Sequence, residues 1–221
     1  NCCDDRNATI LEIGPGLGTL TRELAARYKK VICLEIDTGM IPVLQYTLAD
    51  FDNVTVYNQD VMQADLDELL ADAFASGTVA VCANLPYYIT TPIIMKLLEE
   101  NPGFESIIVM VQKEVADRLA AAPGGKNCGA VTYTVDYYCR AEKVVDVPPE
   151  AFVPAPKVWS SVIKLALRDA PPVETDSKDH LFTLVKAAFL MRRKTFLNCV
   201  GSSKEINCDK EKLKEILEET K

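Results

Sequence analysis

Short apolar runs alternate with longer amphipathic segments through the first 122 residues of the chain. The apolar runs are typical of buried parallel strands, and the segments between them have helical spacing. We expect strands over residues 8–13, 30–36, 53–57, 78–84 and 106–112. The intervening helices are expected over residues 17–28, 39–48, 66–74, 91–99 and 113–122. This order predicts an α/β domain with a mostly parallel sheet and helices on both faces.

The pattern changes after Gly129. Residues 131–140 and 160–167 both have the composition of strands, which predicts a hairpin-like antiparallel edge to the sheet. A polar, proline-bearing linker follows at 168–179, and helices are expected over residues 181–200 and 210–220. We therefore expect a main domain over residues 1–168 and a partial C-terminal helical domain over residues 176–221, which is too short to bury much by itself.

Composition limits the class of protein. With 48% hydrophobic and 25% charged residues the chain should fold as a globule, and no apolar run is long enough to cross a bilayer. The net charge of −8 argues against a generally basic nucleic-acid binder but leaves room for a local basic face. Eight cysteines occur without a CxxC pair, and His180 is the single histidine. We expect reduced cysteines, a cytoplasmic location, no metal site and a monomer.

A glycine-rich loop, "EIGPGLGTLT", follows the first expected strand and opens the first helix. Gly14, Gly16 and Gly18 permit positive φ and allow a ligand to approach backbone amides closely. The spacing is G-x-G-x-G rather than the G-x-G-x-x-G of dinucleotide sites. Together with the preceding acid, Glu12, it is more typical of enzymes that use S-adenosylmethionine (SAM). A tight turn without a ligand is the simpler alternative.

Two further acids follow the next expected strands. Glu35 ends the second strand, where a carboxylate can accept hydrogen bonds from both ribose hydroxyls, and Asp60 follows the third, where it can accept the adenine amino group. Either acid alone could be a solvated loop residue. Because carboxyl ends of parallel strands share one edge of a sheet, the combination predicts a bound adenosine.

The fourth expected strand ends in "NLPYYITTP". An exocyclic adenine nitrogen is a poor nucleophile, and the Asn84 side-chain oxygen and Leu85 carbonyl are two acceptors that can hold its hydrogens. Pro86 would fix the turn that aims this carbonyl, and Tyr87 would stack on the base. We therefore predict a base-methylating corner rather than simple packing of aromatic rings.

The stretches EIGPGLGTLT, LEID, NQDV, NLPYYITTP, MVQKEVADRLAA and AFVPAPKVWSSVIKL, in this order, resemble the small-subunit ribosomal RNA adenine dimethyltransferases. The resemblance covers essentially the whole chain. It implies a Rossmann-like SAM-dependent methyltransferase sheet with a small C-terminal helical domain. The implied reaction is N6,N6-dimethylation of two adjacent adenosines near the 3′ end of 16S rRNA in a pre-30S subunit. Relatives usually carry an N-terminal segment over SAM and a longer C-terminal domain, so we expect this chain to be truncated at both termini.

The resemblance also implies residue roles. Phe152 would stack on the target base from the side opposite Tyr87. The target-base site would consist of Asn84, Leu85, Pro86 and Tyr87. The SAM site would be formed by Glu12, Gly14, Gly16, Gly18, Glu35, Ile36, Asp60, Val61 and Asn84.

Binding RNA requires phosphate contacts, so basic residues must gather despite the negative net charge. "MRRKTFLN" resembles the family's basic helix, although a solvated helix face is an equal alternative from charge alone. The candidate RNA-binding residues are Lys113, Arg118, Arg140, Lys157, Arg192, Arg193 and Lys194.

Three other functions remain open from the sequence. A 23S rRNA adenine methyltransferase of the antibiotic-resistance type shares the chemistry and most motifs. A non-catalytic protein could use the same fold to bind rRNA during ribosome assembly. A dinucleotide oxidoreductase fits least, because the glycine spacing differs and Asn84 would have no role.

Overall fold

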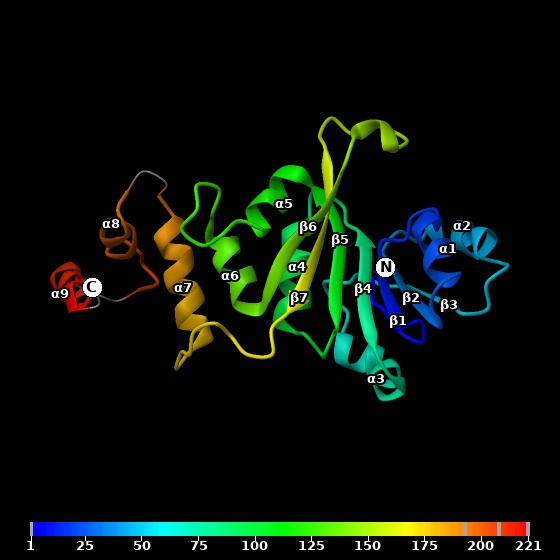
Figure 1. Ribbon diagram of the computed structural model, residues 1–221, viewed down its shortest axis with the longest axis horizontal. Helices are drawn as coiled ribbons and strands as arrows, with labels where there is room; N and C mark the ends of the chain where they lie inside the picture. Colours follow the sequence, from blue (N-terminus) through cyan, green and yellow to red (C-terminus); the bar gives the residue numbers. More distant parts are fainter. Residues whose placement is uncertain (1, 192–193, 207–208, 220–221) are drawn as a thin grey trace.

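The computed structural model describes residues 2–191, 194–206 and 209–219. These residues form a seven-stranded sheet in the order β3-β2-β1-β4-β5-β7-β6 (Figure 1). The strands are β1 (Thr9–Ile13), β2 (Lys30–Glu35), β3 (Val54–Asn58), β4 (Val79–Asn84), β5 (Ser106–Gln112), β6 (Cys139–Val147) and β7 (Ser160–Leu167). Pairs among β1 to β5 are parallel, whereas β7 is antiparallel to both β5 and β6. The prediction of a mostly parallel sheet finished by an antiparallel hairpin is confirmed.

Helices connect the parallel strands, as the alternating pattern predicted. They are α1 (Thr19–Ala25), α2 (Met40–Thr47), α3 (Leu66–Ser76) and α4 (Thr90–Glu99). Helix α5 (Lys113–Leu119) follows the last parallel strand, β5. The remaining helical elements are α6 (Ala130–Tyr138), the 3-10 turn η1 (Pro149–Ala151), α7 (Lys178–Phe189), α8 (Phe196–Val200) and α9 (Lys210–Glu219). Because the strand order runs outward in both directions from β1 and β4, such connections place helices on both faces of the parallel sheet.

Two apolar clusters, one on each side of the sheet, form the core. On one face, alternate strand residues such as Leu11, Val81 and Val109 pack against α3, α4, α5 and α6. On the other, Ile10, Cys33 and Ala80 pack against α1. This alternation is the two-residue period of a strand buried on both sides, and it accounts for the continuous apolar runs in the sequence.

The strand predicted over residues 131–140 is wrong, because α6 occupies most of this segment. Its β-branched and aromatic residues favour a strand locally. Tertiary contacts with α7 override that preference. The ring of Tyr137 meets the Phe182 ring edge-on with their centroids 5.3 Å apart, and the ring centroids of Tyr133 and Phe189 are 5.6 Å apart. Thr132 also caps the helix, since its hydroxyl accepts the Gly129 N–H and donates to the Arg118 carbonyl.

The single helix predicted over residues 181–200 is also wrong. It divides into α7 and α8, and Leu190, Met191, Lys194 and Thr195 lie outside both helices. Ala187, Val200 and Leu213 form a small apolar cluster that joins α7, α8 and α9. These helices lie at the end of the molecule opposite β1, β2 and β3 (Figure 1). The boundary between a main and a C-terminal domain stays a prediction.

Across the described ranges, we find no helix that combines the length and apolar character needed to span a membrane.

Candidate active site

The glycine loop adopts the conformation that its sequence predicts. Gly14, Gly16 and Gly18 have φ of 67°, 57° and 81°, a region that residues with a Cβ rarely adopt. A Cβ built on Gly14 or Gly16 would meet no atom within 4 Å, so backbone faces open space at both positions. At Gly18 it would lie 3.1 Å from the Thr47 hydroxyl oxygen and 3.3 Å from Leu44. The first two glycines expose backbone to a ligand, and the third permits α1 to approach α2.

Glu35 joins the glycine loop to the ends of β2 and β3. One carboxylate oxygen accepts the Gly16 N–H at 3.2 Å and the other accepts the Asp37 N–H at 2.9 Å. The Asn58 side chain donates to the Glu35 carbonyl at 2.7 Å. The side chain is only 5% exposed, and it is therefore held in one orientation. Each carboxylate oxygen retains a second lone pair for a ligand hydroxyl.

Other predicted cofactor residues differ in accessibility. Ile36 is 63% exposed, whereas Val61 is buried in the core. The Asp60 carboxylate accepts the Met62 N–H at 2.9 Å and a Gln63 side-chain N–H at 3.4 Å, which orders the turn after β3. At the same sheet edge as Glu35, Ile36 is thus exposed and Asp60 half-buried, whereas Val61 belongs to the core.

Glu12 lies within the core beneath the glycine loop. Its side chain is 1% exposed, and the Cys33 thiol lies 3.6 Å from one carboxylate oxygen. Burial raises the pKa of this carboxyl to about 7, because the charged form loses its hydration. Glu12 is therefore a core residue that contacts Cys33 of β2, and its predicted contact with a cofactor stays a prediction.

The "NLPY" segment forms a tight turn between β4 and α4. The Leu85 N–H donates to the Met110 carbonyl at 3.1 Å, which extends the pairing of β4 with β5. The Pro86 carbonyl accepts the Thr90 hydroxyl at 2.9 Å and the Ile89 N–H at 3.2 Å. Asn84 is the last residue of β4 and is exposed, so its carboxamide is accessible at the carboxyl end of the strand.

A pocket of about 250 Å³ brings the predicted target-base residues together. Its walls come from two parts of the chain: the turn after β4 and the loop at residues 148–159, which extends beyond the sheet between β6 and β7 (Figure 1). The lining residues are Asn84, Leu85, Pro86, Tyr87, Phe152, Pro154 and Pro156. The structure therefore places Tyr87 and Phe152, which are 65 positions apart, in one pocket.

Ser160 holds one wall of this pocket through Tyr87, and the sequence did not predict this contact. Its hydroxyl lies 2.7 Å from the Tyr87 hydroxyl, and the residue is fully buried at the start of β7. A hydroxyl in that position has to find a partner, because an unsatisfied buried polar group is costly. The signal in the sequence was the polar pair "SS" opening an otherwise apolar strand.

The predicted RNA-binding residues fall into three groups. Lys113 is ion-paired with Asp146, and Arg118 is paired with Glu114 at 2.8 Å, so both charges are partly neutralised. Arg192 and Arg193 lie outside the described residues. Three candidates are exposed and form no ion pair with any residue that the structure describes: Arg140, Lys157 and Lys194.

The strand order and the glycine loop at the end of β1 define a Rossmann-like methyltransferase domain. Comparison with known families gives a narrower answer. The family model of ribosomal RNA adenine dimethylase matches residues 5–220, and the chain belongs to this family. The resemblance found in the sequence is thereby confirmed.

Individual relatives agree with this assignment. The ribosomal RNA small subunit methyltransferase A of Alkaliphilus metalliredigens is 50% identical over 209 residues, which cover 95% of this chain and 72% of that protein. A dimethyladenosine transferase structure from Plasmodium falciparum superposes with a TM-score of 0.76 at 29% identity, covering 98% of this chain and 82% of that one. The 23S rRNA methyltransferase ErmE gives a TM-score of 0.70 at 27% identity, covering 88% and 75%.

The contrast between the glycines predicts different responses to substitution. Gly18→Ala should lower the free energy of unfolding by about 2 to 4 kcal/mol, because a positive φ is combined with a close Cβ contact. Gly14→Ala has the positive φ but open space, and should lose about 1 kcal/mol. Urea unfolding of both variants measures the difference. Equal losses would show that packing of α1 against α2 does not require a glycine at this position.

Proposed function

We propose that this protein transfers methyl groups from SAM to N6 of two adjacent adenosines near the 3′ end of 16S rRNA, within a partly assembled small ribosomal subunit. The main observation in support is the pocket that unites Asn84 to Tyr87 with Phe152 beside the glycine loop. The loop and the pocket are neighbours because β1 pairs directly with β4. The 50% identity to a small-subunit methyltransferase, against 27% to ErmE, favours the small-subunit target.

The glycine loop and the neighbouring strand ends fit SAM. Gly14 and Gly16 leave open space where a Cβ would otherwise project, and a close approach to their backbone is therefore possible. Glu35 would accept the ribose hydroxyls, Ile36 would pack against the adenine ring and Asp60 would accept the adenine amino group. When bound, SAM supplies a methyl group attached to a positively charged sulfur.

The residues of the pocket would orient the target base and hold its protons. The Asn84 side-chain oxygen and the Leu85 carbonyl would each accept one N6 hydrogen, which favours a tetrahedral nitrogen with an available lone pair. Tyr87 and Phe152 would enclose the flipped base between their rings. No strong base is required beforehand, because the nitrogen can release its proton after the new bond forms. Orientation is then the main contribution of the protein.

Among the candidate residues that the structure describes, the exposed cations Arg140, Lys157 and Lys194 are best placed to contact RNA phosphates. We include Arg192 and Arg193 on their sequence alone, and we give Lys113 and Arg118 a smaller part because each is paired with a carboxylate. A folded rRNA surface is the expected target, since side chains cannot reach the base edges in the deep, narrow major groove of an A-form RNA helix. We expect the protein to act as a monomer in the cytoplasm, where ribosomal subunits assemble.

Two assays test this function. Calorimetric titration should give heat with SAM and none with NAD, since the loop lacks the dinucleotide spacing. Labelled methyl groups should then enter under-methylated small subunits and not large-subunit precursors. Incorporation into the large subunit would favour the 23S enzyme. Tight rRNA binding without SAM binding or methyl transfer would favour a non-catalytic assembly protein.

Glu35→Gln keeps the shape of the side chain and removes its charge. We expect SAM affinity to fall by about 1.5 to 3 kcal/mol, because a charge-assisted hydrogen bond to the ribose is weakened. Calorimetry measures the loss, and thermal unfolding of the ligand-free variant shows whether the glycine loop is still supported. Unchanged affinity would remove Glu35 from the ribose site. Glu23→Gln, on the exposed surface of α1, is the matched control.

Asn84→Ala removes one acceptor for the target nitrogen. The rate of methyl transfer should fall on the order of a hundredfold or more, since the lost hydrogen bond would stabilise the target nitrogen in the transition state. SAM affinity should weaken only moderately, because Asn84 lies at the edge of that site. Single-turnover kinetics and calorimetry on the same preparation separate the two effects. A folded variant that no longer binds SAM would contradict this division of roles.

A further inference from the structure

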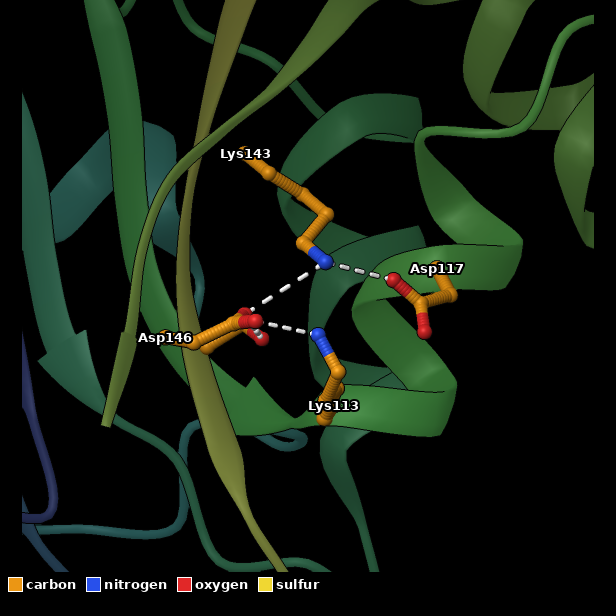
Figure 2. Close-up of polar contacts among 5 residues, drawn as sticks. Lys113, Asp117, Lys143 and Asp146 are labelled. Atoms are coloured by element: carbon orange, nitrogen blue, oxygen red, sulfur yellow. Dashed lines mark hydrogen bonds and ion pairs between the residues drawn. The ribbon is translucent and has the colours of Figure 1, made fainter. Parts of the chain in front are cut away.

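Four charged side chains form a network at the base of the loop that carries Phe152 (Figure 2). Asp146, near the end of β6, is paired with Lys113 at the start of α5. Lys143 bridges two carboxylates, with Asp117 at 2.6 Å and Asp146 at 3.4 Å. The Ser161 hydroxyl, on β7, donates to Asp146 at 2.5 Å. One carboxylate therefore joins β6, β7 and α5 at the point where the loop leaves the sheet.

A β-bulge makes this arrangement possible. Residues three apart on a regular strand point to opposite faces, so Lys143 and Asp146 would be separated by the sheet. The register of β6 against β7 shifts between Lys143 and Val145, which inserts one extra residue. Both side chains then lie on the face next to α5 (Figure 2). Bulges commonly redirect a side chain near a functional site.

Lys113 also holds the far end of the same loop. Its backbone N–H donates to the Trp159 carbonyl at 2.9 Å, while its ammonium group pairs with Asp146. Directly after Trp159, the hydroxyl of Ser160 meets the Tyr87 hydroxyl in the pocket. The two ends of residues 148–159 are thus joined to α5 and to the pocket wall.

We propose that Asp146 is a positioning residue, which with Lys113 and Ser161 holds the loop at residues 148–159 so that Phe152 lies over the target-base pocket. The network touches neither the pocket lining nor the glycine loop, and it acts through the loop. The inference rests on the proposed function, because it takes this pocket as the target-base site. It gives Lys113 a structural role in addition to the smaller part in RNA binding that its ion pair leaves.

Asp146 and Lys143 keep their charges over any ordinary assay range of pH. The pairing of Asp146 with Lys113, supported by Ser161 and Lys143, lowers the pKa of that carboxyl to about 2. The carboxylate of Asp117, and secondarily that of Asp146, raises the pKa of Lys143 above its ordinary value. Substitution, rather than a change of pH, is therefore the way to remove the network.

The first measurement follows the loop without requiring activity. Trp159 is the single tryptophan of the chain and lies at the end of the loop, so tryptophan fluorescence reports on the surroundings of this end of the loop alone. Asp146→Asn should raise acrylamide quenching of Trp159 by about twofold, as the loop moves more freely. Lys113→Met and Ser161→Ala should do the same, whereas Lys113→Arg should resemble the parent protein. Glu23→Gln removes an exposed ion pair on α1 and should leave the fluorescence unchanged.

The second measurement follows methyl transfer to under-methylated small subunits. Asp146→Asn should lower kcat about tenfold through misplacement of the stacking ring, with KM for SAM within about twofold. Lys113→Arg should retain most of the parent rate, because arginine can keep the ion pair with Asp146. Unchanged quenching in Asp146→Asn, or altered quenching with an unchanged kcat, overturns the proposal. If the parent protein transfers no methyl groups, the proposed function fails, and the fluorescence still decides whether Asp146 holds the loop.

Discussion

The parallel pairing of β1 with both β2 and β4 determines where the two functional loops lie. The sheet extends from β1 to β3 in one direction and from β4 to β6 in the other. Ligands bind at such a reversal, because the loops at the carboxyl ends of the two central strands diverge there. The glycine loop follows β1 and the "NLPY" turn follows β4, so a methyl donor on one and an acceptor base on the other would be neighbours.

The two halves of the site are ordered in different ways. At the glycine loop, the proposed donor side, the buried carboxylate of Glu35 accepts backbone N–H groups from Gly16 and Asp37, and the shape of the loop is set locally. At the acceptor side, the wall that holds Phe152 comes from a long connection with little regular structure. Such loops are mobile unless other contacts order them. The network around Asp146 and the bond between Tyr87 and Ser160 supply those contacts.

The parallel part of the fold could be predicted, because buried parallel strands appear in the sequence as short apolar runs between amphipathic helices. The positions of Gly14, Glu35 and Asn84 could be predicted with it, because each lies at or just after the end of such a run. Helix α6 could not, since residues 130–138 favour a strand locally and become helical through aromatic contacts with α7. Asp146 and Ser160 were missed for a related reason. Their roles depend on a bulge and on a pairing between distant strands, and neither feature has a local signature.

Strand β5 lies between the two strands that carry the walls of the proposed target-base pocket. Met110 of β5 lies opposite Asn84 of β4 on one side and opposite Val162 of β7 on the other, so one strand separates the two walls. Two residues further along, Gln112 lies opposite Ser160, which places the Ser160 hydroxyl level with Tyr87 beyond the end of β4. A slip of one residue between β5 and β7 would turn Ser160 to the other face and remove its bond to Tyr87. Because Ser161 would turn with it and lose Asp146, the same slip would also free the base of the loop. The pairing of β5 with β7 thus couples the two aromatic walls, even though Tyr87 and Phe152 belong to different connections.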